Sequence, residues 1–121
     1  MTRVLVVEDN PANMKLAALL LEQAGYEVLQ ATDADSGIAL ARERSPALIL
    51  MDVQLPGMNG LDATRALKRD PRTASIKVVA VTAFAMTGDD RRMAEAGCDA
   101  YVSKPIRYRA LLDVIRGMVG G

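Results

Sequence analysis

The stretch ALILMDVQLPGMNG, residues 47–60, contains the pattern that decides the fold. Its apolar run, Ala47–Met51, is followed by an aspartate and then by a loop marked by proline and glycine. A continuous apolar run of this length is typical of a strand covered on both faces in a parallel sheet. Because a buried carboxylate without a partner is costly, Asp52 is expected either at an exposed edge or in a site that uses its charge.

Strand-like and helix-like segments alternate along the whole chain. The short apolar runs predict strands at Val4–Val7, Glu27–Ala31, Ala47–Met51, Val78–Val81 and Ala100–Val102. The segments between and after them predict helices at Asn13–Ala24, Ala34–Arg44, Leu61–Arg69, Asp89–Ala96 and Ile106–Met118. This alternation indicates an α/β fold, an open parallel five-stranded sheet with helices on both faces and right-handed crossovers.

Turn and capping residues support these boundaries. Asp33 is a good N-cap for the second helix, and either Asn10 or Asn13 suits the first. Gly25 and Gly97 follow two of the helices, where a left-handed residue commonly ends a helix.

Composition limits the function classes. The 121 residues are enough for one domain, expected over 1–121 without an output domain. Lys plus Arg and Asp plus Glu are equal at 15 each, which argues against a nucleic-acid-binding surface. A single cysteine, Cys98, and the lack of a signal peptide or an apolar span predict a cytoplasmic protein away from membranes. The absence of histidine excludes His-based catalysis and His-ligated metals in this chain.

Polar residues follow the predicted strands at the edge where ligands gather in such sheets. Glu8 and Asp9 follow the first strand, Asp52 the third, Thr82 the fourth and Lys104 the fifth. Each has an ordinary explanation when taken alone, such as a loop cap, a strand threonine or a solvated lysine. Their common place at one sheet edge favours a functional site.

Three carboxylates in one cleft need positive charge among them. Lys104 supplies one charge, and a hard Mg²⁺ ion with oxygen ligands suits the rest. Asp52 can then act as a nucleophile and form an aspartyl phosphate, while Lys104 and the metal neutralise charge on the phosphoryl oxygens and Thr82 donates its hydroxyl. The set therefore predicts a Mg²⁺-dependent phosphoryl acceptor.

The chain resembles the receiver domain of two-component response regulators, the CheY-like superfamily. The resemblance rests on VLVVEDN, LILMDVQLPGMNG, VVAVTA and AYVSKPI, which together cover the chain from end to end. It is nearest to stand-alone, DivK-like receivers through NMKL, AVTAFAM followed by GD, and GCDAYVSKPI. This resemblance implies the flavodoxin/CheY-like strand order 2-1-3-4-5.

The resemblance also implies a role for each site residue. Asp52 would be the phosphoacceptor, with Thr82 and Lys104 binding the phosphoryl group and Thr82 and Tyr101 acting as the switch. Mg²⁺ would be bound by Asp9 and Asp52 directly, by Glu8 through water, and by the backbone carbonyl of Gln54. The Lys104–Pro105 bond would be cis. Two variable positions that flank the site, Gln54 and Phe84, would affect the rate at which water reaches the acyl phosphate.

The partners implied are a sensor histidine kinase or histidine phosphotransfer protein and a downstream protein target. The donor would dock near Asn13, Met14, Ala17, Pro105 and Ile106, and the target on the fourth helix, fifth strand and fifth helix. The chain would be a monomer or a weak phosphorylation-dependent dimer, and no enzyme beyond its own phosphorylation and dephosphorylation.

Alternative interpretations remain open from the sequence. The chain could be a phosphorylation-independent interaction module with a receiver-like shape, or a receiver cut from a larger hybrid kinase or transcription factor. A phosphatase or a flavin-binding protein fits poorly. Asp52 is followed by VQL rather than by a DxDxT pattern, and EDN stands where a flavin site needs a hydroxyl- and glycine-rich loop.

Overall fold

The computed structural model describes residues 1–83 and 89–120. Its strands are β1 (Arg3–Val7), β2 (Glu27–Ala31), β3 (Leu48–Asp52), β4 (Lys77–Thr82) and β5 (Ala100–Ser103). Its helices are α1 (Pro11–Gln23), α2 (Ala34–Arg44), α3 (Gly60–Arg69), α4 (Asp89–Ala96) and α5 (Tyr108–Val119). The predicted alternation of strand and helix is confirmed.

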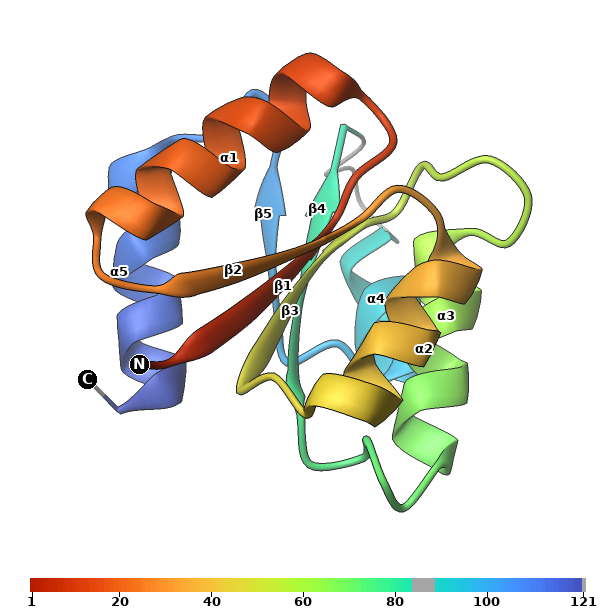
Figure 1. Cartoon of the computed structure of the whole chain (residues 1–121). Coiled ribbons are helices and arrows are strands. Elements are labelled where there is room, and N and C mark those ends of the chain that lie inside the picture. The colour runs from red at the N-terminus through yellow and green to blue at the C-terminus, as the bar shows by residue number, and fades with distance from the viewer. Residues whose placement is uncertain (84–88, 121) are drawn as a thin grey trace.

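The sheet lies between two layers of helices (Figure 1). All strand pairs are parallel, and the order is β2-β1-β3-β4-β5, as predicted. Helices α1 and α5 cover one face, while α2, α3 and α4 cover the other (Figure 1). The chain order reverses direction across the sheet between β1 and β3, so a crevice is expected beyond the carboxyl ends of these two strands.

Alternate residues of the central strands supply the two cores. In β1, Val4 and Val6 pack with α1 and α5, whereas Leu5 and Val7 pack with α2 and α3. All four side chains are at most 2 % exposed. Burying one such side chain is worth about 1.5–3 kcal/mol, so both faces of the central strands contribute to stability. The central strands are therefore continuously apolar because helices cover both of their faces.

Several strand boundaries differ by one residue from the prediction. Asp52 and Thr82 are the last residues of β3 and β4, whereas the sequence pattern ended each strand just before them. The reason is backbone pairing, since Asp52 lies opposite Val81 and the Val53 N–H donates to the Val81 carbonyl at 2.9 Å. A polar side chain thus ends the apolar run in the sequence, but the backbone pairing of the strand continues through that residue.

The first and last helices also begin elsewhere than predicted. Asn10, not Asn13, caps α1, because its side chain accepts from the N–H groups of Ala12 and Asn13, and Pro11 therefore opens the helix. Helix α5 begins at Tyr108 rather than Ile106, and its first turn has no side-chain cap. By contrast, the side chain of Asp33 accepts from Ser36 N–H, as expected of an N-cap.

Gly60 allows the start of α3 to lie directly against the end of β3. Its N–H donates to the Val53 carbonyl at 3.1 Å. A Cβ atom at this position would overlap the carbonyl oxygen of Asp52 and lie 2.9 Å from its carbonyl carbon. Because backbone atoms cannot yield as a flexible side chain can, only glycine fits here without moving Asp52.

We expect Gly60→Ala to lower the free energy of unfolding by about 2–3 kcal/mol, because the new methyl group must displace the Asp52 backbone. Gly117→Ala is the matched control, since a Cβ atom at Gly117, within α5, meets nothing within 4 Å. That control is expected to be neutral or stabilising by up to about 1 kcal/mol. Urea unfolding of the wild type and both variants measures these changes in the free energy of unfolding. Equal stabilities would contradict the close approach at Gly60.

Candidate functional site

The five predicted site residues converge at the carboxyl end of the sheet. Glu8 and Asp9 lie between β1 and α1, Asp52 ends β3, Thr82 ends β4, and Lys104 follows β5. Parallel strands bring these positions together although the residues are far apart in sequence. The structure thus places every member of the predicted set at one edge.

Asp52 is held between a cation and a backbone donor. Asp52 is only 3 % exposed. The Lys104 ammonium donates to Asp52 Oδ2 at 3.0 Å, and the Gln54 N–H donates to Asp52 Oδ1 at 2.9 Å. Charge-assisted bonds of this kind stabilise the ionised carboxylate. These two partners compensate for the burial of a carboxylate at the end of a central strand.

Glu8, Asp9 and Asp52 form an acidic cluster. One ligand oxygen from each lies within 4.8 Å of the others, with Glu8 and Asp52 buried and Asp9 exposed. Glu8 also lies 3.8 Å from the Lys104 ammonium and accepts from Asn10 N–H at 3.4 Å. Three carboxylates beside one ammonium leave two negative charges when all are ionised.

Burial and this charge imbalance together shift the pKa values of the ionisable groups around the cluster. Burial, a hydrogen bond to Asp52 and the charge of Asp52 together raise the pKa of Glu8 from 4.5 to about 7. Burial alone would lower the pKa of Lys104, but the hydrogen bond and charge of Asp52 outweigh it and raise that pKa. The same field reaches Tyr108, where burial and the charge of Glu8 raise the phenol pKa.

The donor set fits a hard divalent cation. Carboxylate oxygens are the ligands of Mg²⁺ and Ca²⁺, and Mg²⁺ in particular binds through one or two carboxylates while keeping several waters. Exposed Asp9 opens the cluster to solvent. Burial first, and then the hydrogen bond and charge of Asp52, raise the pKa of Glu8, and a cation at the cluster would offset the effect of that charge. Glu8, Asp9 and Asp52 could therefore hold such an ion.

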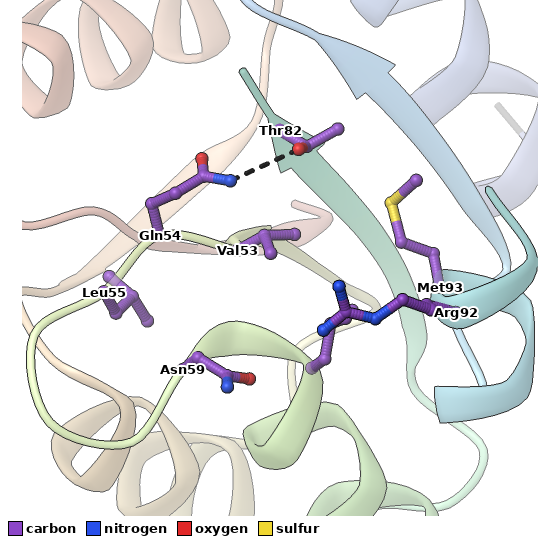
Figure 2. A pocket seen from close by; sticks show the side chains of 8 residues that line it. Val53, Gln54, Leu55, Asn59, Thr82, Arg92 and Met93 are labelled. Atoms are coloured by element: carbon purple, nitrogen blue, oxygen red, sulfur yellow. Dashed lines mark hydrogen bonds between the residues drawn. The ribbon is translucent and has the colours of Figure 1, made fainter. Parts of the chain in front are cut away.

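Thr82 is buried and contacts the side chain of Gln54. The Gln54 Nε2 donates to Thr82 Oγ1 at 3.3 Å, and Ala83 N–H donates to Gln54 Oε1, also at 3.3 Å. Figure 2 shows the Gln54 amide directed toward Thr82. Both residues line a pocket of about 280 Å³. The sequence analysis assigned the backbone carbonyl of Gln54 to metal binding and its side chain to the access of water, with no contact to Thr82 or Ala83. Nothing in the sequence pattern indicated that its side chain spans two strand ends.

The remaining predicted residues near the site have mixed outcomes. Tyr101 is 46 % exposed on β5, so its ring faces solvent in this structure. The Lys104–Pro105 peptide is cis, as predicted. Phe84 lies outside the described residues.

The expected donor-docking surface needs a correction. Met14 and Ala17 are 5 % and 3 % exposed and pack in the core under α1, because their positions on the helix face the sheet. Their side chains therefore do not face a partner. Asn13 is exposed, and it lines a small pocket beside the site together with Glu8, Leu16, Lys104, Pro105, Ile106 and Tyr108. The sequence analysis did not predict that Leu16 and Tyr108 would line a pocket with these residues.

Within residues 1–83 and 89–120, no helix has the length and apolarity needed to cross a membrane.

Comparisons with known proteins agree with this geometry. The model of the response regulator receiver domain family matches residues 4–116. The polar-differentiation response regulators DivK of Brucella anthropi and Brucella melitensis are each 47 % identical over 117 residues, covering 97 % of this chain and 95 % of the relative.

Solved structures give the same result. The receiver domain of sensor histidine kinase PA1611 from Pseudomonas aeruginosa is 30 % identical with a TM-score of 0.91, covering 99 % of this chain and 98 % of that one. In that structure a magnesium ion is coordinated in the active-site cleft. A CheY-like receiver domain protein from Methanospirillum hungatei is 31 % identical with a TM-score of 0.92, covering 99 % and 94 %.

The raised pKa of Glu8 predicts a pH-dependent stability in the metal-free protein. Folded Glu8 keeps its proton up to about pH 7, whereas the unfolded chain releases it near 4.5. The native state therefore binds more protons between these values, and its stability falls as pH rises through this window.

With a chelator present, we expect urea unfolding to show a loss on the order of 2 kcal/mol between about pH 5 and about pH 8. Glu8→Gln is the control, because it cannot ionise and should flatten this part of the profile. The lack of histidine leaves few other groups that titrate in the window. An unchanged slope in Glu8→Gln would contradict the assignment.

Proposed function

Because this chain belongs to the response regulator receiver domain family, we propose that it accepts a phosphoryl group on Asp52 from a phosphohistidine of a partner protein. These 121 residues contain no histidine, so none of them can be the phosphohistidine donor. Two-component signalling is the process in which such a domain acts, and phosphorylation would change which proteins it binds.

The observation that carries this proposal is the environment of Asp52. Its carboxylate lies at the carboxyl edge of the sheet, 3.0 Å from Lys104 and within the acidic cluster with Glu8 and Asp9. A carboxylate that served only as a loop cap would not need an ammonium and two further carboxylates beside it. A nucleophile that receives an anionic phosphoryl group needs positive charge at this place.

In the proposed reaction, a carboxylate oxygen of Asp52 attacks the phosphorus of the phosphohistidine. The new P–O bond forms as the P–N bond breaks, and the imidazole leaves with the electron pair and takes up a proton. Lys104, already bound to Asp52, is placed to contact a phosphoryl oxygen. Thr82, at the end of the neighbouring strand, is the expected hydroxyl donor.

We assign Mg²⁺ binding to Asp9 and Asp52 directly, to Glu8 through water and to the backbone carbonyl of Gln54. When bound, the ion would neutralise negative charge on the phosphoryl oxygens. Two features of the chain support this assignment: the proximity of the three carboxylates and the raised pKa of Glu8. The magnesium ion in the Pseudomonas aeruginosa receiver domain supports it as well.

Phosphorylation would act as a switch by replacing the single charge of the Asp52 carboxylate with a phosphoryl group of about two negative charges next to Thr82 and Lys104. We propose that Thr82 moves toward the phosphoryl group and that Tyr101, exposed here, changes its rotamer in response. The surface formed by α4, β5 and α5 would then bind the downstream protein with a different affinity. The phosphoryl donor would dock near Asn13, Pro105 and Ile106, in the cytoplasm, with the chain a monomer or a weak dimer.

A phosphorylation-independent interaction module is the second candidate, and the site disfavours it. Such a module would have no need for Asp52, Lys104 and two further carboxylates in one buried cluster, because unbalanced charge destabilises the fold. Nothing in the described residues specifically favours this alternative.

The test is incubation with acetyl phosphate and Mg²⁺, followed by intact mass spectrometry. We expect a single phosphoryl adduct that requires Mg²⁺ and disappears in Asp52→Ala. Asp62→Ala is the matched control, since Asp62 is an exposed aspartate on α3 that pairs with Arg65 and is not part of the acidic cluster. A folded, Mg²⁺-saturated protein without an adduct would contradict the proposal.

NMR spectra with beryllofluoride, an analogue of the phosphoryl group, provide the second measurement. Binding is expected to shift the amide signals of Thr82 and Tyr101 in the wild type and not in Asp52→Ala. Signal shifts confined to the acidic cluster would mean that binding does not reach Thr82 and Tyr101, and they would contradict the proposed switch.

A further inference from the structure

We propose that the side-chain amide of Gln54 is a latch that holds Thr82 and Ala83 in their unphosphorylated positions and must release them when a phosphoryl group binds. The inference rests on the proposed function of Asp52 and goes beyond it, because it assigns Gln54 a positioning role that opposes phosphoryl binding.

The first support is the bidentate contact. The two polar atoms of the Gln54 amide contact different groups of β4 and the residue after it, Thr82 Oγ1 and Ala83 N–H, each at 3.3 Å. The polarity of the contact is complementary, because the amide nitrogen donates and the amide oxygen accepts. One side chain thus contacts the Thr82 hydroxyl, as Figure 2 shows, and the Ala83 N–H.

The second support is where these two groups lie. Asp52 is opposite Val81 in the sheet, so Thr82 and Ala83 are the next residues along β4 beyond the phosphoacceptor. They are therefore well placed to contact a phosphoryl group on Asp52. Ala83 has a single backbone N–H, which cannot make a full bond to Gln54 and to a phosphoryl oxygen at once. The Gln54 amide and an incoming phosphoryl group compete for this donor.

The third support is that Gln54 is tied to Asp52 as well. Its backbone N–H donates to Asp52 Oδ1 at 2.9 Å, while its side chain reaches β4. Conversion of Asp52 to an acyl phosphate changes the charge and geometry of the acceptor of this backbone bond. Gln54 therefore links the reacting carboxylate to Thr82 through one residue.

The surroundings permit release. Gln54 is an exposed residue, and the adjoining pocket of about 280 Å³ is lined partly by the apolar side chains of Val53, Leu55, Leu61 and Met93. An amide side chain that loses its contact with β4 can turn to solvent without leaving a buried polar group unpaired. The latch is thus held by weak bonds that water can replace.

The test compares beryllofluoride affinity, in saturating Mg²⁺, for the wild type, Gln54→Met and Gln54→Ala. Methionine keeps the length and bulk of glutamine but cannot make either hydrogen bond, so it separates the latch from simple steric shielding. Gln23→Met is the matched control, since Gln23 is an exposed glutamine at the end of α1. Titrations are followed by NMR, and hydrogen exchange of the Ala83 amide is measured without beryllofluoride.

We expect Gln54→Met and Gln54→Ala each to bind beryllofluoride about threefold more tightly, the effect of losing weak, solvent-exposed hydrogen bonds in the unliganded state. The Ala83 amide should exchange faster in both variants, and Gln23→Met should match the wild type. Affinity that is unchanged or weaker in Gln54→Met would overturn the latch, as would tighter binding in Gln54→Ala alone, which would indicate bulk. No binding by the wild type would overturn the proposed function itself, and the latch with it.

Discussion

The ion pair between Asp52 and Lys104 is the interaction on which the site depends. A carboxylate that is 3 % exposed at the end of a central strand requires compensation, and Lys104 provides it at 3.0 Å. Glu8 and Asp9 then add more negative charge than one ammonium can balance. The fold maintains this imbalance because the cluster is anchored by strands whose cores are fully packed. This unbalanced negative charge costs stability, and it creates a local field that attracts a cation. Bound there, a cation would offset the negative charge of an incoming phosphoryl group.

The backbone around Asp52 keeps that field in place. Gly60 lets α3 begin against the Asp52 carbonyl, and the Gln54 N–H orients one carboxylate oxygen. At the fifth strand, the Lys104 N–H donates to the Thr82 carbonyl at 2.8 Å, which ties the base of the lysine to the end of β4. The acceptor, the cation and the hydroxyl are thus mounted on adjacent strands. Gln54 joins these strands as well, since its backbone N–H contacts Asp52 and its side chain contacts Thr82.

The sequence predicted the architecture well because its signals are local and periodic. The bounds of α2 follow from the Asp33 cap, and those of α4 from Gly97. The convergence of Glu8, Asp9, Asp52, Thr82 and Lys104 followed from strand alternation alone. Tertiary facts could not be predicted in this way. The burial of Met14 and Ala17 depends on the rotation of α1 against the sheet, and the Gln54 side-chain bonds depend on the path of one loop.

The most direct measurement of the central claim is calorimetric titration of the wild type, Asp9→Asn and Asp52→Asn with Mg²⁺ in buffers of different ionisation enthalpy. We expect one Mg²⁺ ion to bind per chain, with partial proton release from Glu8 near pH 7, where its pKa lies. Binding should be strongly weakened in both variants, because each loses a charged ligand of the cluster. Mg²⁺ affinity that is equal in all three proteins, or no binding by the wild type, would contradict the account.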